Sequence, residues 1–153
     1  MKKAFSLVEI LVVIAIIAIL TTLLLPNYIE SRQRTRDVQR KSDLRQLQNA
    51  LELYKQNQTP QLYPSIIPAL PCNTWSSGTI VYMNKVPKDP SSNCPAASAR
   101  KYYYSTNDDD STYTMYACLD NVGDIDVESC PGDFNTVTGY TCSSNKCYKV
   151  LQP

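Results

Sequence analysis

The sequence has no histidine, only four glycines and a single tryptophan among its 153 residues. Without histidine, the chain cannot form a Ser-His-Asp triad, a Cys-His nucleophile pair or a His-ligated metal site. No two of its six cysteines are spaced as Cys-x-x-Cys, which excludes a thioredoxin-like motif and argues against a zinc ribbon. A net charge of +1 and a hydrophobic content of 43% exclude a strongly basic nucleic-acid binder and a disordered chain.

All the cysteines lie after residue 71: Cys72, Cys94, Cys118, Cys130, Cys142 and Cys147. An even set of cysteines in an exported chain predicts three disulfides formed in an oxidising compartment, with free thiols as the alternative. We favour pairing in sequence order, because Cys142 and Cys147 flank a four-residue turn and would face each other across a hairpin. The pairing of the other four cysteines is open.

The N-terminal segment is apolar and almost free of charge. Residues 10–29 contain no charged side chain, and Lys2 and Lys3 precede them. Twenty residues rising 1.5 Å each form a helix of about 30 Å, which matches the thickness of a bilayer core. Basic residues stay on the cytoplasmic side, so the segment predicts a single-pass helix in the cytoplasmic membrane with the chain after residue 30 outside.

Two common export signals do not fit this segment. A cleaved secretory signal would end in small residues spaced as Ala-x-Ala, and a lipoprotein signal needs an early cysteine, whereas the first here is Cys72. A plain membrane anchor stays open, although Glu9 would cost about 2.5 kcal/mol or more at the bilayer centre. Pro26 does not suit a plain anchor either, because a proline inside a helix removes a backbone hydrogen bond.

The sequence KKAFSLVEI at residues 2–10, with the apolar run and Pro26 after it, resembles the class III signal of bacterial type IV pilins and type II secretion pseudopilins. In that family a prepilin peptidase removes a short basic leader and N-methylates the new terminus. The resemblance implies that the chain is cleaved between Ala4 and Phe5 and that Phe5 is methylated. Ala4 stands where the family usually has glycine, a departure that could slow cleavage.

The resemblance also implies assembly roles for Glu9 and Pro26. In a filament of bundled helices, Glu9 of one subunit would neutralise the amine of Phe5 on its neighbour. Breaking such a pair strands a buried charge, so the pair would set the axial register. Pro26 would let residues 18–26 bend or unwind during assembly; the alternative is a kink without a mechanical role.

The rest of the chain predicts an α+β fold shaped like a ladle, in which a long N-terminal helix packs on a small antiparallel β-sheet head. The helix runs from Phe5 to Gln56, because no glycine or proline interrupts residues 27–59 and apolar residues recur at helical spacing. That stripe contains Val38, Leu44, Leu47, Leu51 and Tyr54. Four parts follow: a leader (1–4), a membrane or filament-core half-helix (5–29), an amphipathic half-helix (30–57) and a disulfide-bearing head (58–153).

The head predicts three to five antiparallel strands. Two Tyr-rich strands at 101–106 and 112–119 flank an Asn/Asp turn, with Tyr113, Met115 and then Ala117 or Leu119 facing the helix. A final hairpin would supply strands at 138–142 and 146–150. The sequence VPKDP, followed by a Tyr-rich hairpin, is similar to the head of the major pseudopilin of type II secretion.

Charge divides unevenly, with +2 in the leader, +2 in the helix and −3 in the head. A basic collar on the helix predicts a solvated face or salt bridges to the heads of neighbouring subunits, with nucleic-acid binding as a less favoured alternative. It comprises Arg32, Arg34, Arg36, Arg40, Lys41 and Arg45.

By resemblance, Asp120, Asp124 and Asp126 are calcium candidates. Their spacing is not that of an EF-hand, and a solvated acidic turn is the alternative.

The resemblance implies a structural subunit without catalytic activity or a required cofactor, polymerised through its helix into a filament for adhesion or twitching motility. Its partners would be further copies of itself, the prepilin peptidase and the pilus assembly machinery. It would lie in the cytoplasmic membrane before assembly and in a surface filament afterwards. The alternatives are a pseudopilin of a secretion or DNA-uptake piston, and a membrane-anchored binding module that never polymerises.

Overall fold

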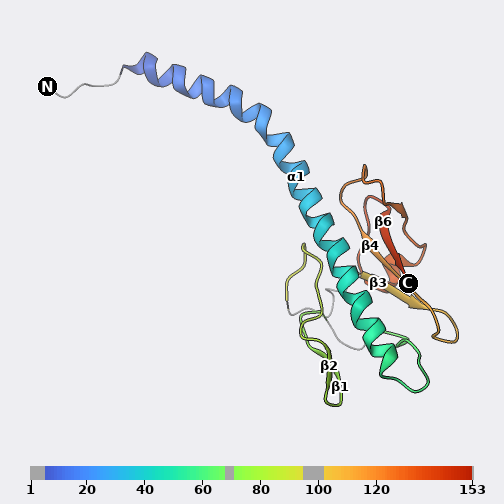
Figure 1. Ribbon diagram of the computed structural model, residues 1–153. Coiled ribbons are helices and arrows are strands. Elements are labelled where there is room, and N and C mark those ends of the chain that lie inside the picture. The colour runs from blue at the N-terminus through green and yellow to red at the C-terminus, as the bar shows by residue number, and fades with distance from the viewer. Residues whose placement is uncertain (1–5, 68–70, 95–101, 153) are drawn as a thin grey trace.

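A computed structural model describes residues 6–67, 71–94 and 102–152, with the side chains of residues 23–27 excepted. A long helix, α1 (Leu7–Gln56), is followed by an antiparallel β-sheet head, which confirms the predicted α+β fold. The N-terminal half of α1 projects away from the head, and its C-terminal half lies along the head (Figure 1). The head contains β1 (Trp75–Ser77), β2 (Ile80–Met83), β3 (Tyr102–Thr106), β4 (Tyr113–Cys118), β5 (Glu128–Ser129), α2 (Phe134–Thr138) and β6 (Lys146–Leu151).

The helix α1 is continuous over 50 residues and passes through Pro26. It begins after Ser6, whose carbonyl oxygen accepts from the backbone N–H of Glu9 at 3.1 Å. It ends at Asn57, whose side-chain amide donates to the carbonyl oxygen of Leu53 at 2.7 Å. The helix curves on its way to the head (Figure 1). The predicted bending or unwinding at residues 18–26 during assembly stays a prediction.

The C-terminal half of α1 buries its apolar stripe against the sheet. Leu44 and Leu51 are fully buried, as are Met115 and Ala117 on β4, so these side chains form the centre of one core. Burial of this apolar surface is the main force that holds the helix on the head. Val38 was wrongly placed in the stripe: its side chain is 67% exposed, because it lies outside the helix face that packs on the sheet.

The main sheet has the strand order β3-β4-β6-β5 and is antiparallel throughout. Three predicted strands are present as β3, β4 and β6, and alternate residues of β4 face the helix as expected. The hairpin of β1 and β2 forms a separate two-stranded sheet that the sequence did not reveal. Its Trp75 is 1% exposed and packs against the rings of Tyr54 and Tyr82, at centroid distances of 5.6 and 5.7 Å.

The predicted strand at 138–142 was wrong, and with it the final hairpin. Thr138 is the last residue of the short helix α2, which buries Phe134 against the ring of Tyr103, and residues 139–142 form no strand. Gly139 ends the helix with a φ of 65°, a left-handed conformation that glycine adopts without strain. The strand β6 therefore pairs with β4 and β5, which come from earlier in the chain.

Candidate functional site

The N-terminal half of α1 carries a large exposed apolar surface. Eleven side chains between residues 7 and 20 are 48% to 79% exposed: Leu7, Val8, Ile10, Leu11, Val12, Val13, Ile14, Ile16, Ile17, Ile19 and Leu20. They surround the helix on all sides, so no single packed face accounts for them. Apolar surface of this extent needs lipid or other protein chains to cover it.

Glu9 is the only acidic residue in the first turn of α1 and lies exposed among these side chains. No lysine or arginine of the described residues forms an ion pair with it. Ala4 and Phe5, the predicted cleavage site, lie outside the described residues. The predicted assembly role of Glu9 therefore stays a prediction.

Within the part of the chain that the structure describes, no helix combines the length and the apolar character needed to cross a membrane.

Arg40 anchors the helix to the head through a buried cluster of charges. Its side chain is 1% exposed, and its Nε donates to Oδ2 of Asp89 at 2.8 Å. Its Nη1 donates to Oδ1 of Asp37 at 2.7 Å and lies 3.1 Å from Oδ1 of Asp120. One guanidinium thus meets three carboxylates, two of which are also almost completely buried. Removing one partner from such a cluster would be strongly destabilising, because it would leave an uncompensated charge inside the protein.

The carboxylates of this cluster also receive hydrogen bonds from the head. Asp37 accepts from the backbone N–H groups of Asp120 and Asn121, at 2.9 and 2.7 Å. Asp89 accepts from the backbone N–H of Ser91 at 2.8 Å. These bonds use the remaining oxygen lone pairs, so the buried acids are satisfied. The cluster fastens both the loop after β4 and the VPKDP segment to α1.

The pKa of Asp89 in this cluster and the pKa of the neighbouring Asp43 are shifted in opposite directions. Burial favours the neutral form of Asp89, but hydrogen bonds from Arg40 and Ser91 outweigh it and hold the pKa of Asp89 below its usual value. Asp43, one turn after Arg40, is buried too. Burial raises its pKa, and the nearby charge of Asp89 adds to the rise, while a hydrogen bond from Tyr102 at 2.6 Å partly opposes it.

The acidic loop after β4 is held by Lys41. The Nζ of Lys41 lies 2.7 Å from Oδ1 of Asp124 and 3.1 Å from Oδ2 of Asp126. Asp120 pairs instead with Arg36, at 2.7 Å, and with Arg40. Side-chain cations therefore already neutralise all three calcium candidates, and the carboxylates do not form an open cage of oxygens. A calcium ion at this loop would have to displace these cations, and the calcium site stays an untested prediction.

The basic collar divides into two groups. Arg36, Arg40 and Lys41 pair with their own head, and for Arg36 and Arg40 this corrects the expectation of salt bridges with neighbouring subunits. The other three, Arg32, Arg34 and Arg45, are exposed. Arg34 pairs with Glu30 one turn away, and Arg32 lies over the ring of Tyr28 at 5.6 Å. Only this second group is free to meet another molecule.

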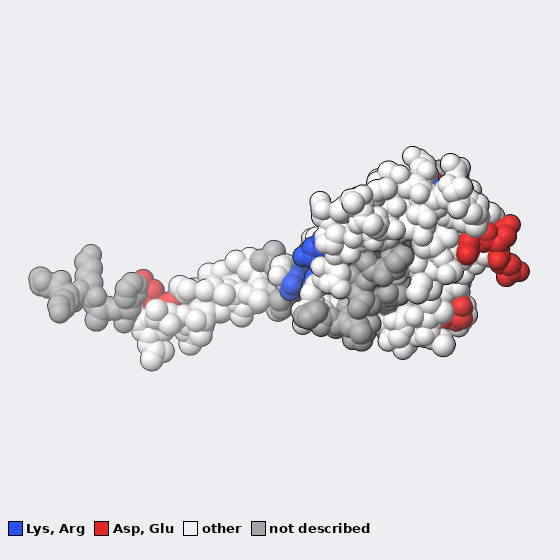
Figure 2. Space-filling view, turned by 90° about the horizontal axis from the view of Figure 1, so that it is seen from below, with Lys and Arg blue, Asp and Glu red and all other residues white. Residues whose placement is uncertain are grey.

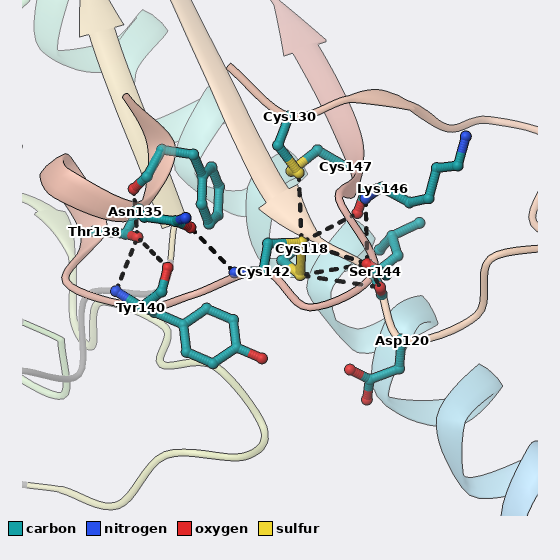
Figure 3. Close-up of a disulfide and its surroundings, with 12 residues drawn as sticks. Cys118, Asp120, Cys130, Asn135, Thr138, Tyr140, Cys142, Ser144, Lys146 and Cys147 are labelled. Atoms are coloured by element: carbon teal, nitrogen blue, oxygen red, sulfur yellow. Dashed lines mark hydrogen bonds between the residues drawn. A yellow bond between two sulfur atoms is a disulfide. The ribbon is translucent and has the colours of Figure 1, made fainter. Parts of the chain in front are cut away.

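Three disulfides brace the head: Cys72–Cys94, Cys118–Cys142 and Cys130–Cys147. Figure 3 shows the last two side by side, with Sγ of Cys130 and Sγ of Cys142 3.4 Å apart. Ser144 lies beside them and donates to the carbonyl oxygen of Leu119 at 2.7 Å. The two bonds join the segments that follow β5 and α2 to the two central strands, β4 and β6.

Pairing in sequence order was right for Cys72 and Cys94 and wrong for the other four cysteines. The error follows from the missing final hairpin. Cys147 is on β6 and directly opposite Cys118 in the register of β4 and β6, while Cys142 lies in the turn region before β6. Cys118 reaches Cys142 with Cα atoms 5.7 Å apart, and Cys130 reaches Cys147 with Cα atoms 5.0 Å apart.

Two residues with structural roles escaped the sequence reasoning. Asp89 lies in VPKDP, a motif that had been noticed, but nothing local points to Arg40 as its partner. Glu52 accepts from the hydroxyl of Tyr63 at 2.9 Å and from that of Tyr113 at 3.2 Å. The sequence pointed to the role of Glu52 even less, since Glu52 looks like any acidic residue on an amphipathic helix.

Comparisons with known proteins found a matching family and a similar protein. Residues 1–25 match the family described as "Prokaryotic N-terminal methylation motif". The chain is 32% identical over 96 residues to the "Type II secretion system core protein G" of Escherichia coli (strain K12). That alignment covers 58% of this chain and 66% of the relative, just under two thirds of its length. No solved structure gives a significant match.

Proposed function

Because the chain belongs to the type IV pilin and pseudopilin family, we propose that it is a structural subunit of a type IV pilus-like filament. In this proposal it is inserted in the cytoplasmic membrane with its head outside. A prepilin peptidase cleaves it after Ala4 and methylates Phe5. It then polymerises through its N-terminal helix, with Glu9 paired to the terminal amine of a neighbour.

The exposed apolar rod carries this proposal. Eleven apolar side chains that surround one helix cannot remain in water, and the head covers only the C-terminal half of α1. Lipid would cover the rod before assembly and other rods would cover it afterwards. The family is one of filament subunits rather than enzymes, so assembly is the work that this surface serves.

A pseudopilin in a secretion piston is the second candidate, and the similarity to a type II secretion core protein favours it. Both candidates share the rod, the processing and the helical assembly. They differ in the length and the place of the filament. A pilus for adhesion or twitching motility is a long surface fibre, whereas a pseudopilus is short and periplasmic.

Mass spectrometry of the N-terminal peptide tests the processing step. We expect a mature chain that begins with N-methylated Phe5, and a Phe5→Ser variant should test how strictly that residue is required. A mature chain that begins at Met1 would support a non-polymerising anchor. Electron microscopy of sheared cell-surface material then separates the two candidates: abundant long fibres favour a pilus, and their absence from processed wild-type cells favours a pseudopilus.

A further inference from the structure

The head carries opposite charges at its two ends. Figure 2 shows basic side chains where the rod meets the head and acidic side chains at the far end of the molecule. Arg32 and Arg34 are the first basic residues of α1 and precede Arg36, which contacts the head. At the other end, the turn between β3 and β4 contains Asp108, Asp109 and Asp110 in succession.

The acidic turn lies near the C-terminal end of α1. The backbone N–H of Tyr63, just beyond that helix, donates to the carbonyl oxygen of Asp110 at 2.9 Å. The helix rises about 36 Å between Arg32 and Gln56, so the two charged ends are separated by roughly that distance along the rod.

The charges at both ends have little compensation from the described residues of their own chain. Among the described residues, no lysine or arginine forms an ion pair with Asp108, Asp109 or Asp110. Arg32 likewise meets no described carboxylate, and Arg34 has only an exposed pair with Glu30. Exposed pairs of this kind contribute little, so both arginines remain available to another molecule.

The shapes of the two ends also differ. Beside Arg34, Val38 is 67% exposed and Ile125 is 95% exposed, and all three border one surface hollow. At the acidic end, a hollow of about 420 Å³ is lined by the apolar Leu62 and Ile66 together with polar residues such as Gln58, Thr59 and Asp110. An apolar knob next to the basic end thus has a counterpart next to the acidic end.

We propose that a second copy of this chain docks head to tail, with its acidic turn on Arg32 and Arg34 of the first copy. Ile125 of the first copy then enters the hollow beside Asp110 of the second. Because the contact joins two different surfaces, the pair of copies still has one free basic end and one free acidic end. Further copies can therefore add, and the contact extends an open filament instead of closing into a dimer. The contact rests on the proposed function and gives it an axial offset of about 36 Å between the touching copies.

Charge exchange in the full chain tests this contact in cells that process and assemble it. We expect the double variants Asp108→Lys/Asp109→Lys and Arg32→Asp/Arg34→Asp each to lower the yield of sheared filaments about tenfold or more, because like charges would then meet. The variant that combines all four changes should recover assembly. Arg45→Asp, which reverses an exposed charge outside the contact, is the control and should assemble normally.

Ile125→Ser gives an independent readout. The side chain is exposed, so we expect the unfolding temperature of the head to stay unchanged while filament yield falls. Normal filaments from all the reversed variants, or no recovery in the combined variant, would overturn the contact and leave the proposed function standing. Absence of any assembly by the processed wild-type chain would overturn the proposed function itself and the contact with it.

Discussion

Arg40 on α1 and Asp89 in the head form a buried ion pair, with Nε of the arginine 2.8 Å from Oδ2 of the carboxylate. The two residues are 49 positions apart, and each is at most 2% exposed. The pair joins the rod to the VPKDP segment, while Asp37 and Asp120 join the same guanidinium to the loop after β4. The attachment of the head to its helix therefore includes a buried cation, besides the apolar core and the more exposed ion pairs of Arg36 and Lys41.

Replacing Arg40 with methionine should destabilise the head strongly. The change leaves Asp37 and Asp89 buried without their cation, and breaking a buried pair from one side costs about 3 to 5 kcal/mol. Urea unfolding of the full chain in detergent, followed by the near-UV signal of the head, measures the loss. Arg45→Met on the same helix is the matched control, because Arg45 is exposed. Equal stability of the two variants would contradict an anchoring role.

Acid should weaken the head through Asp89 and Asp124. Hydrogen bonds from Arg40 and Ser91 lower the pKa of Asp89 despite its burial, and those from Lys41 and the backbone of Asp126 lower that of Asp124. A lowered folded-state pKa contributes stability above the unfolded value of about 3.9, and this stability is lost as the pH falls through the lower folded value. Unfolding free energy should therefore fall below about pH 4, and the fall should be shallower in Asp89→Asn.

Asp43 should act in the opposite direction. Burial raises its pKa, so its contribution to stability is complete below the unfolded value and is lost as the pH rises through the folded one. At neutral pH the buried charge is a cost. Asp43→Asn keeps an oxygen that accepts from the hydroxyl of Tyr102, and we expect equal or greater stability at pH 7 in the same urea assay. A clear loss of stability would show that the charge itself is needed.

Peptide mapping of the unreduced protein should recover Cys118 linked to Cys142 and Cys130 linked to Cys147. The double variant Cys118→Ser/Cys142→Ser should lose about 2 to 5 kcal/mol of stability, as is usual when a native disulfide is removed from a small domain. A peptide that links Cys142 directly to Cys147 would contradict the structure and restore the hairpin pairing that the sequence favoured.

Glu9→Leu should abolish or severely reduce filament assembly while leaving membrane insertion and the fold of the head intact. The leucine cannot neutralise the amine of a neighbouring Phe5, so one charge would remain buried in the filament core. Counting filaments by electron microscopy checks the first effect, and the disulfide map of the head checks the second. Wild-type numbers of filaments from the variant would refute the pairing.

Calcium should not stabilise the wild-type head, because Lys41 already lies between Asp124 and Asp126. Calorimetric titration and thermal unfolding with added calcium test this expectation. Lys41→Ala, which removes the ammonium but keeps both carboxylates, is the informative comparison. Heat of binding and a higher unfolding temperature in the wild-type chain would show that calcium displaces the lysine.

The sequence by itself determined the features that depend on neighbouring residues. The absence of glycine and proline from residues 27–59 was enough for a long helix, and the recurrence of Leu44, Leu47 and Leu51 was enough to identify its buried face. Alternation in Tyr113, Met115 and Ala117 likewise identified the strand that packs on this face. Each signal is local, since it is carried by backbone geometry and hydrophobic periodicity over a few turns or residues.

Only the tertiary structure decided which distant groups meet. The basic collar looked like a surface for other subunits, yet Arg36 and Lys41 reach carboxylates 84 and 83 positions away in their own chain. The exchange of disulfide partners between Cys142 and Cys147 has the same origin, since residues 139–142 form no strand and Cys142 does not face Cys147 across a hairpin. Ion pairs and disulfides form between groups that the fold brings within a few ångströms of each other. The spacing of those groups along the chain does not reveal that distance.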